Sequence, residues 1–352
     1  MPSSLDPSKG TPEGVGLSGL TCPTIKETFM NMYKLLKAAL AVLFFLCAPL
    51  ASAQDRSPIT ILVGFAPGGT SDLTARLIAQ YLPEHIGRPV VVVNRPGALG
   101  VSSIRELIST DDVNRVYVVL PFSSVIFPAL TRTPAPYDVF NDMQPVASIA
   151  SFPLGVAVNA GTGVKTPRDL VAWMKANPKS TIFGTAGAGG HNHFLGLDLG
   201  KAIGVDSTVV PYKGNAPMMS DLLPGHIPAA VMVAGEVISH TEGGRVRLVG
   251  VLTPTRSTLM PDVPTFAEQG VNVTSGESWY GMWAPAKAEK TQVQKMQDAV
   301  RKILANKEVQ RTLAEKLAMQ ADFRDSSQTD QRLRRDHAYW APIIKASGFK
   351  AD

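Results

Sequence analysis

Short apolar runs alternate with helix-like patterns along most of the chain. Residues 59–65 and 116–120 are apolar, and between them Leu73, Leu77 and Ile78 recur at helical spacing. A short apolar run bounded by turn residues is typical of a buried strand, and the spacing that follows is typical of a helix. Repeated strand–helix units predict a parallel, doubly wound sheet.

A second series of strand–helix units follows the first. The expected strands of this series are 154–158, 182–185, 208–210, 229–233 and 248–252. Thr166 and Pro167 predict a helix start as N-cap and first-turn residue, and further helices are expected from about His191 to Ile203 and near 217–223. The tail from 291 to 345 reads as three helices, the last starting after Ser326-Ser327.

These patterns predict two α/β units with short connections. We expect residues 54–150 together with 276–352 to form the first domain and residues 151–275 to form the second. In open α/β sheets, ligands bind beyond the carboxyl ends of the strands. A ligand cleft is therefore expected between the two domains.

Residues 1–53 are interpreted as an N-terminal extension followed by a secretory signal peptide. Lys34 and Lys37 precede an apolar run from 38 to 50, and Ala51-Ser52-Ala53 supplies small residues before a cleavage point after Ala53. The apolar run is too short to span a bilayer. The signal predicts a periplasmic location. Translation from Met30 or Met32 is an alternative to Met1.

Cysteine usage and charge narrow the chemistry. Cys22 and Cys47 both precede the expected cleavage point, so the mature chain has no cysteine, disulfide or cysteine metal site. The full chain has 34 basic and 29 acidic residues. Without the four basic and three acidic residues of the leader, the mature chain has 30 basic and 26 acidic residues. This slight positive excess is compatible with anionic ligands, and no basic run with interleaved aromatics indicates nucleic acid.

Two of the expected strands lead into glycine-rich loops that open helices. The first loop runs from Phe65 to Asp72 and the second from Thr185 to His193. A helix N-terminus presents free backbone N–H groups and the positive end of the helix dipole, which suit a carboxylate or phosphate. The glycine spacing is not G-x-G-x-x-G and the Walker lysine is missing, so the loops indicate a small anion and no nucleotide.

Longer motifs carry a family resemblance that covers nearly all of the mature chain. In order they are GFAPGGTSDLTARLIAQYL, GRPVVVVNRPGALG, PYDVFNDMQPVASIASFPLGVAVN, FGTAGAGGHNHFLG, VPYKGNAPMMSDLLPGHIPAAV, TRSTLMPDVPTFAEQGV and SWYGMWAP. This series resembles the substrate-binding proteins of tripartite tricarboxylate transporters, the Bug family. The resemblance implies an α/β, type II-like periplasmic binding protein: a two-domain clamshell in which each domain is a doubly wound, mostly parallel sheet. It implies no cofactor.

The resemblance also implies the site residues. In that family a carboxylate is held between two glycine-rich loops, largely by backbone N–H groups and bridging water. Carried over by position, the ligand-binding residues are Phe65, Ala66, Gly68, Gly69, Thr70 and Asp72 in the first loop, Thr185, Ala186, Gly187, Gly190, His191 and His193 in the second, and Ser123, Ser124 and Gly235 in the walls. Trp279-Tyr280 is expected near the hinge side.

The chain departs from the family pattern at three places. Asn114-Arg115-Val116-Tyr117 replaces the usual Asp-Gly-Tyr-Thr, Gly190 stands where Ser is usual, and His191-Asn192 is unusual before His193. These departures bear on the ligand's identity more than on the fold.

Several candidate residues have two interpretations. Asp72 either stabilises the first helical turn through the dipole or, with an amine-bearing ligand, faces that ligand. His191 and His193 form an H-x-H pair, but no third ligand has a metal-site spacing and the two would not face each other on a helix, so no metal is expected. We expect His193 to anchor the loop by a hydrogen bond and His191 to reach the ligand.

The function expected first is a periplasmic solute receptor. It would capture a small carboxylate, such as a di- or tricarboxylate or an aromatic or amino acid, and deliver it as a monomer to membrane permease subunits. A receptor that presents its ligand-bound form to a two-component sensor kinase is the alternative. A secreted hydrolase is less well supported, because Ser123-Ser124 lacks a G-x-S-x-G elbow; no enzyme is expected.

Overall fold

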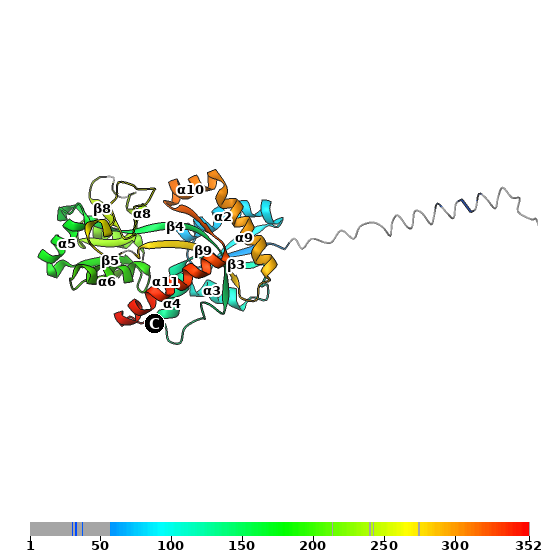
Figure 1. Ribbon diagram of the computed structural model, residues 1–352, viewed down its shortest axis with the longest axis horizontal. Helices are drawn as coiled ribbons and strands as arrows, with labels where there is room; N and C mark the ends of the chain where they lie inside the picture. Colours follow the sequence, from blue (N-terminus) through cyan, green and yellow to red (C-terminus); the bar gives the residue numbers. More distant parts are fainter. Residues whose placement is uncertain are drawn as a thin grey trace, which may run out of the picture. The chain divides into compact units, whose positions relative to one another are not determined.

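The computed structural model describes residues 30, 32, 33 and 37, and residues 57–351 except 213, 239, 240, 242 and 274. The chain divides into two compact units, residues 1–55 and 56–352, and the fold below is that of the second unit (Figure 1). Apart from those four early positions, the predicted signal peptide and its cleavage point lie outside the described residues. Within the described part, no helix is long and apolar enough to cross a membrane.

The first lobe is built on three parallel strands. β1 (Ile59–Val63) lies between β2 (Val90–Asn94) and β3 (Val116–Pro121). Four of the five residues of β1 are buried, as expected for a strand covered on both faces. One helix follows each of these strands, namely α2 (Thr70–Ile86) after β1, α3 (Val101–Ser109) after β2 and α4 (Phe122–Thr131) after β3.

The second lobe repeats this plan. β5 (Ile182–Ala186) lies between β6 (Thr208–Tyr212) and β7 (Ala229–Val233), again in parallel. Thr166 caps the helix at Pro167 as predicted, in a capping box with Asp169. The helices of this lobe are α5 (Pro167–Ala176), α6 (His191–Ile203), α7 (Asn215–Leu222) and α8 (Ala234–Ile238).

Two antiparallel strands join the lobes. The first part of β4 (Met143–Asn159) pairs with β9 (Glu277–Pro285) and β10 (Gln320–Arg324), and its last part pairs with β7 and β8 (Val246–Val251). Because β9 also pairs with β3, all ten strands form one mixed sheet. Figure 1 shows β4 and β9 running between the green elements of the second lobe and the blue elements of the first.

The α/β class predicted from the strand–helix alternation is confirmed. Among the described strands, four of nine ladders are parallel, and these are the ladders within β1–β3 and β5–β7. The other five are antiparallel, because each involves β4 or β9. The mostly parallel sheet expected for each domain is therefore found within β1–β3 and within β5–β7. The crossing strands β4 and β9 make the sheet as a whole mixed.

The C-terminal segment covers the sheet with three helices, as predicted. They are α9 (Lys290–Ala305), α10 (Lys307–Leu317) and α11 (Ser326–Ser347), and β10 lies between the last two. α11 starts at Ser326, capped by Asp325. It contacts β4, α4 and α6, so this one helix touches both lobes.

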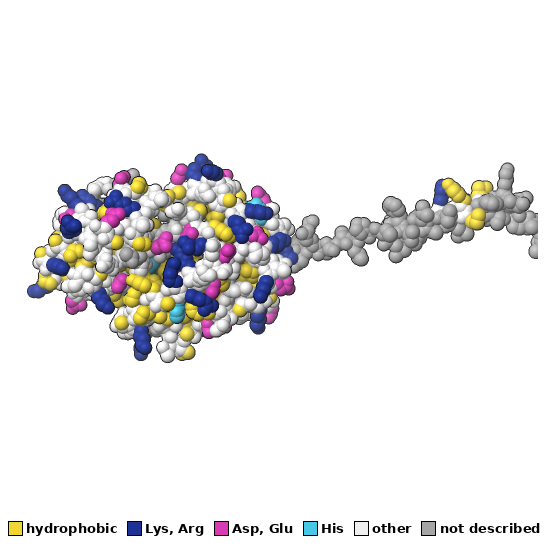
Figure 2. Space-filling model, in the orientation of Figure 1, with side chains coloured by type: hydrophobic (Ala, Val, Ile, Leu, Met, Phe, Trp, Pro, Cys, Tyr) yellow, Lys and Arg dark blue, Asp and Glu magenta, His cyan; other side chains and the backbone are white. Residues whose placement is uncertain are grey.

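The surface carries charges of both signs. Figure 2 shows Lys and Arg side chains interspersed with Asp and Glu over the face in view, without an extended stripe of one sign. The formal net charge of the whole chain is +5. The charge pattern of this face therefore singles out no partner.

Candidate ligand-binding site

Several helices that follow parallel strands begin without a side-chain cap, and three of them concern the predicted loops and walls of the site. α2, α4 and α6 follow β1, β3 and β5, and their N-cap residues Gly69, Pro121 and Gly190 make no capping hydrogen bond. Each helix therefore presents first-turn N–H groups and the positive end of its dipole. By contrast, Thr166 and Asp325 cap α5 and α11 with capping boxes.

Two of these N-termini, those of α4 and α6, line one cavity of about 170 Å³, here called the loop cavity. α3, α7 and α9 also begin without a side-chain cap, but their residues do not line the cavity. The start of α2 does not line it either and adjoins it through the hydroxyl pair of Ser71 and the lining residue Tyr280. At roughly 30 Å³ per water, the loop cavity has room for about six water-sized groups. The predicted site residues that line it are Phe65, Ser123, Ser124, Ala186, Gly190 and His191.

The lining of the loop cavity is uncharged. No Lys, Arg, Asp or Glu is among the described residues that line it. An anion in this cavity would be held by backbone N–H groups, hydroxyls and the dipoles of α4 and α6. The arrangement is therefore suited to one small anion and offers no side-chain cation.

Asp72 holds the first loop together. Its buried carboxylate accepts hydrogen bonds from the Gly68 N–H, the Arg76 Nε and the Asn94 Nδ2, each at 2.9 Å. Burial alone would raise the pKa of Asp72, but the bonds from Arg76, Gly68 and Asn94 outweigh it and lower the pKa to about 2. Asn94 also donates to the Phe65 carbonyl, so this carboxylate fixes the loop to the end of β2.

Hydroxyl groups tie the first loop to the crossing strand β9. The Ser71 and Tyr280 hydroxyls lie 2.9 Å apart and are buried. Burial raises the pKa of Tyr280 to about 12, although its bond to Ser71 lowers it, so the phenol stays protonated. At the neighbouring α4 N-terminus, the Tyr137 hydroxyl donates to the Ser124 carbonyl at 2.9 Å. These bonds fix the wall from which Ser123 and Ser124 face the cavity.

His191 links the second loop to the chain segment that crosses back to the first lobe. Its Nε2 donates to the Ser275 carbonyl at 2.8 Å, which leaves Nδ1 as the unprotonated, buried nitrogen. The ring contacts Phe122, Phe127 and Trp340 of the first lobe, with centroids 5.1–5.9 Å apart. Burial lowers its pKa to about 4, against an opposing contribution from Ser275, so the imidazole is neutral at physiological pH.

His193 lies off the loop cavity. Its ring contacts Phe194 and Phe349 with centroids 5.4 and 5.1 Å apart, and its buried Nδ1 has no hydrogen-bond partner among the described residues. The loop anchor predicted for this residue is thus an aromatic contact with the C-terminal segment. Thr185 is also buried and donates to the Gly187 carbonyl, which shapes the turn from within.

The wall residue Gly235 lies at the rim between the lobes. Val233, two residues earlier, lines the loop cavity, whereas Gly235 contacts Ala318 of the first lobe. Next to it, Glu236 accepts a 3.5 Å hydrogen bond from the Thr70 hydroxyl, at the start of α2. Burial raises the pKa of Glu236, opposed by its bonds from Thr70 and Asn215. The two lobes therefore touch across the rim.

Six of the fifteen predicted site residues line the cavity, and the other nine lie beside it. Ala66, Gly68, Gly69, Thr70 and Asp72 belong to the first loop, Thr185, Gly187 and His193 to the second, and Gly235 to the rim. Eight further residues line the cavity and were not among the predicted site residues, namely Leu99, Pro121, Phe152, Leu154, Asn192, Val233, Ser278 and Tyr280. All of these except Pro121 and Val233 occur in the motifs that carry the family resemblance, so they could have been found, and Tyr280 was expected only near the hinge side.

Two other chemistries find little support in this geometry. Among the described residues, no group of three or more His, Cys, Asp or Glu side chains could hold a metal ion. Ser123 and His191 both line the loop cavity, but the unprotonated Nδ1 of that ring is buried and makes no hydrogen bond to Ser123 or to any other described residue. His191 is therefore not placed as a base for a serine nucleophile.

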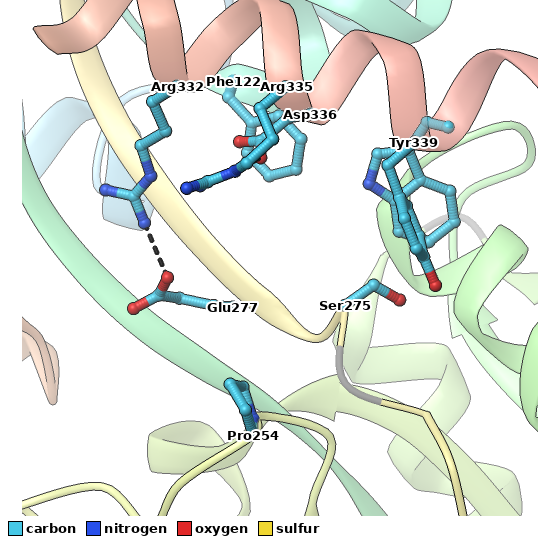
Figure 3. Close-up of a pocket in the computed structure, with 9 residues that line it drawn as sticks. Phe122, Pro254, Ser275, Glu277, Arg332, Arg335, Asp336 and Tyr339 are labelled. Carbon is cyan, nitrogen blue, oxygen red and sulfur yellow. Dashed lines mark hydrogen bonds and ion pairs between the residues drawn. The ribbon is translucent and has the colours of Figure 1, made fainter.

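A larger cavity, of about 310 Å³, lies beside α11 and is called the α11 cavity (Figure 3). Arg332 reaches into it from α11, is almost fully buried, and donates to Asp322 at 2.6 Å and to Glu277 at 2.8 Å. Asp336 accepts from the Trp279 indole at 2.8 Å. Because these charged groups bind each other or the protein, size alone does not make this cavity the better candidate.

Comparison with known proteins places this geometry in a class. Rpa4515 from R. palustris, solved with adipate, has 26% sequence identity and a TM-score of 0.75, covering 84% of this chain and 98% of its own. A structure described as a periplasmic transporter has 28% identity and a TM-score of 0.73, with the same coverage. The two-lobed α/β fold is thus that of the periplasmic binding proteins, as the resemblance implies.

The family is equally clear. The family described as "Tripartite tricarboxylate transporter family receptor" matches residues 74–349. Protein BugT from Bordetella pertussis is 28% identical over 327 residues, which cover 91% of this chain and 99% of BugT. The chain belongs to the tripartite tricarboxylate transporter receptor family, and the predicted Bug-family resemblance is confirmed.

Proposed function

We propose that this chain is a periplasmic solute-binding protein that captures a small carboxylate in the loop cavity. The observation that carries the proposal is the convergence of two uncapped helix N-termini, those of α4 and α6, on a cavity without a charged lining side chain. Each N-terminus carries about half a positive elementary charge, so the two together can balance one carboxylate. The adipate bound to the similar protein Rpa4515 supports this ligand class.

Residue roles follow from the positions described above. Backbone N–H groups at the start of α4 and at Gly190–His191 would bind the carboxylate, and the Ser123 and Ser124 hydroxyls would complete its shell. Asp72 would act indirectly, by fixing the first loop through Gly68 and Asn94. His191 would hold the second loop against the segment that crosses back to the first lobe, through its hydrogen bond to the Ser275 carbonyl.

Capture would be completed by closure of two domains, residues 54–150 with 276–352 and residues 151–275. A ligand that touches both domains stabilises the closed state by its differential affinity for that state. We propose that the protein acts as a monomer in the periplasm after cleavage behind Ala53. The closed form would deliver its ligand to the permease subunits of a tripartite tricarboxylate-type transporter, without catalysis.

A thermal-shift screen tests the ligand class. The protein recovered from the periplasm of expressing cells is heated with mono-, di- and tricarboxylates, aromatic acids and amino acids, and with uncharged amides of the same acids as controls. We expect at least one carboxylate to raise the melting temperature while its amide does not, because binding to the native state alone stabilises it. No shift with any carboxylate would contradict the proposal.

A further inference from the structure

The rim between the lobes contains a contact closer than side chains allow. A Cβ atom built on Gly235 of α8 would lie 2.0 Å from the Cβ of Ala318. The next nearest atoms, the Ala318 Cα and carbonyl oxygen, would lie at 3.4 and 3.7 Å, within ordinary van der Waals range. Only the methyl group of Ala318 therefore prevents a side chain at position 235.

This contact joins opposite lobes beside the loop cavity. Ala318 ends α10 in the first lobe, whereas α8 follows β7 in the second. Val233 lines the cavity two residues before Gly235, and Glu236 accepts from Thr70 across the same gap. The backbone contact thus lies where the two cavity walls approach each other at the rim.

Ala318 also has an unusual backbone. Its φ is +50°, in the left-handed region that glycine adopts more easily than alanine. Its N–H caps α10 by donating to the Leu313 carbonyl. A glycine at this position would suit the helix end better, so what alanine adds there is the methyl group that meets Gly235.

We propose that Gly235 and Ala318 form a steric stop that sets how far the lobes close, and so determine the size of carboxylate that the loop cavity accepts. The inference rests on the proposed function. The cavity has Phe65 and Ser123 on one wall and Ala186, Gly190 and Val233 on the other, so their separation depends on lobe closure. A methyl group at position 235 would require the backbones to separate by about 1.4 Å to bring the 2.0 Å approach to 3.4 Å.

The contact offers a matched set of variants. Gly235→Ala adds the obstructing methyl group, and Ala318→Gly removes its partner. In the double variant, the new Cβ meets only the Cα and carbonyl oxygen of residue 318 at ordinary distances. The double variant should therefore close as the wild type does, whereas Gly235→Ala should not.

Calorimetric titration with linear dicarboxylates from succinate to suberate measures the effect. We expect Gly235→Ala to bind the shortest wild-type ligand roughly tenfold or more weakly, as overpacking a tight contact does, and to shift its preference to longer chains. The double variant should restore the wild-type order. A uniform loss without a change in length preference, or no rescue by Ala318→Gly, would overturn the inference.

A distance measurement separates this inference from the proposed function. Spin labels are attached at Arg168→Cys in α5 and Gln294→Cys in α9, both exposed positions. The distance between the two labels reports lobe separation. No other cysteine would be labelled in the mature protein, because Cys22 and Cys47 precede the predicted cleavage point. We expect Gly235→Ala to lengthen this distance and the double variant to restore it. If the wild type bound no dicarboxylate of the series, the proposed binding of dicarboxylates in the loop cavity would be contradicted. The label distances would then by themselves support or overturn the steric stop formed by Gly235 and Ala318.

Discussion

The loop cavity and the α11 cavity differ in where their charge lies. In the α11 cavity, the charge is on side chains, and Arg332, Glu277 and Asp336 already have partners within the protein. In the loop cavity no lining side chain within the described part is charged, and the positive potential comes from the starts of α4 and α6.

This difference distinguishes a structural cavity from a binding cavity. Charged groups that satisfy each other gain little from a ligand and lose much when one partner is removed. Uncapped helix N-termini remain unsatisfied by the chain and can gain from an anion. The smaller cavity is therefore the candidate site, and substitutions in the two cavities should affect different quantities.

The largest effect is expected in the α11 cavity. Arg332→Met should lower the free energy of unfolding by about 3 kcal/mol, because it removes the two charge-assisted hydrogen bonds that the almost fully buried guanidinium makes to Asp322 and Glu277. Ligand affinity of the folded protein should stay within about threefold, since separate sites are usually independent. Denaturant unfolding and calorimetry check the two quantities. Arg334→Met, which removes an exposed ion pair with Asp330, is the control, and a stable Arg332→Met protein without affinity would reverse the assignment of the two cavities.

His191 predicts a pH dependence of stability. Its pKa is about 4 in the folded protein and 6.5 ordinarily, so below pH 6.5 the unfolded chain takes up the proton first. Stability should therefore be constant above pH 6.5 and fall by about 3 kcal/mol as the pH approaches 4. Denaturant unfolding between pH 4.5 and 8 measures the slope.

Variants identify the group responsible for that slope. Burial also lowers the pKa values of His193 and His337, which act in the same direction. His191→Gln should remove the largest part of the slope, while His85→Gln on the exposed face of α2 should leave it unchanged. An unchanged slope in His191→Gln would show that this ring is not the buried neutral imidazole described here.

A carboxylate placed in the second loop should compete with the ligand. Gly190 has φ −91° and ψ 178°, and a side chain there would meet nothing within 4 Å, so Gly190→Asp can cap α6 without strain. We expect about a hundredfold loss of affinity, with an unchanged or slightly raised melting temperature. Gly190→Ala should lose only a few-fold, and full binding by Gly190→Asp would exclude this N-terminus from the site.

The smallest effect is expected at Asp72. Asp72→Asn should cost about 2 kcal/mol of stability, because an amide cannot replace the charged acceptor of three hydrogen bonds, and should weaken ligand binding a few-fold through the first loop. Since the folded pKa of Asp72 is about 2 and its ordinary value 3.8, this stabilisation should persist above pH 4 and disappear only as the pH falls toward 2. A large loss of affinity with unchanged stability would indicate direct ligand contact instead.

Much of the local structure could be predicted from the sequence. The helix His191–Ile203, the strand Ala229–Val233 and the cap at Thr166 were all indicated by their own residues. The strand β4 was recognised only at 154–158, because Pro145 and Pro153 and two register shifts interrupt its first part. Local pattern therefore finds compact elements better than the long strand that joins the lobes.

The walls of the site depend on contacts that no local pattern contains. Both glycine loops could be predicted, since strand, glycine turn and helix start are adjacent in the chain. Phe152, Ser278 and Tyr280 line the cavity from strands that cross between lobes. The orientation of His191 depends on Ser275, 84 residues away, and Gly235 meets Ala318 only because the lobes approach each other.

The central claim is that helix N-termini capture a carboxylate in the loop cavity. Its most direct test is mass spectrometry of the small molecules that co-purify with the wild type and with Gly190→Asp. We expect the wild type to release a small carboxylate that is absent from the variant. Equal recovery from both proteins, or release of no molecule that carries a carboxylate, would contradict it.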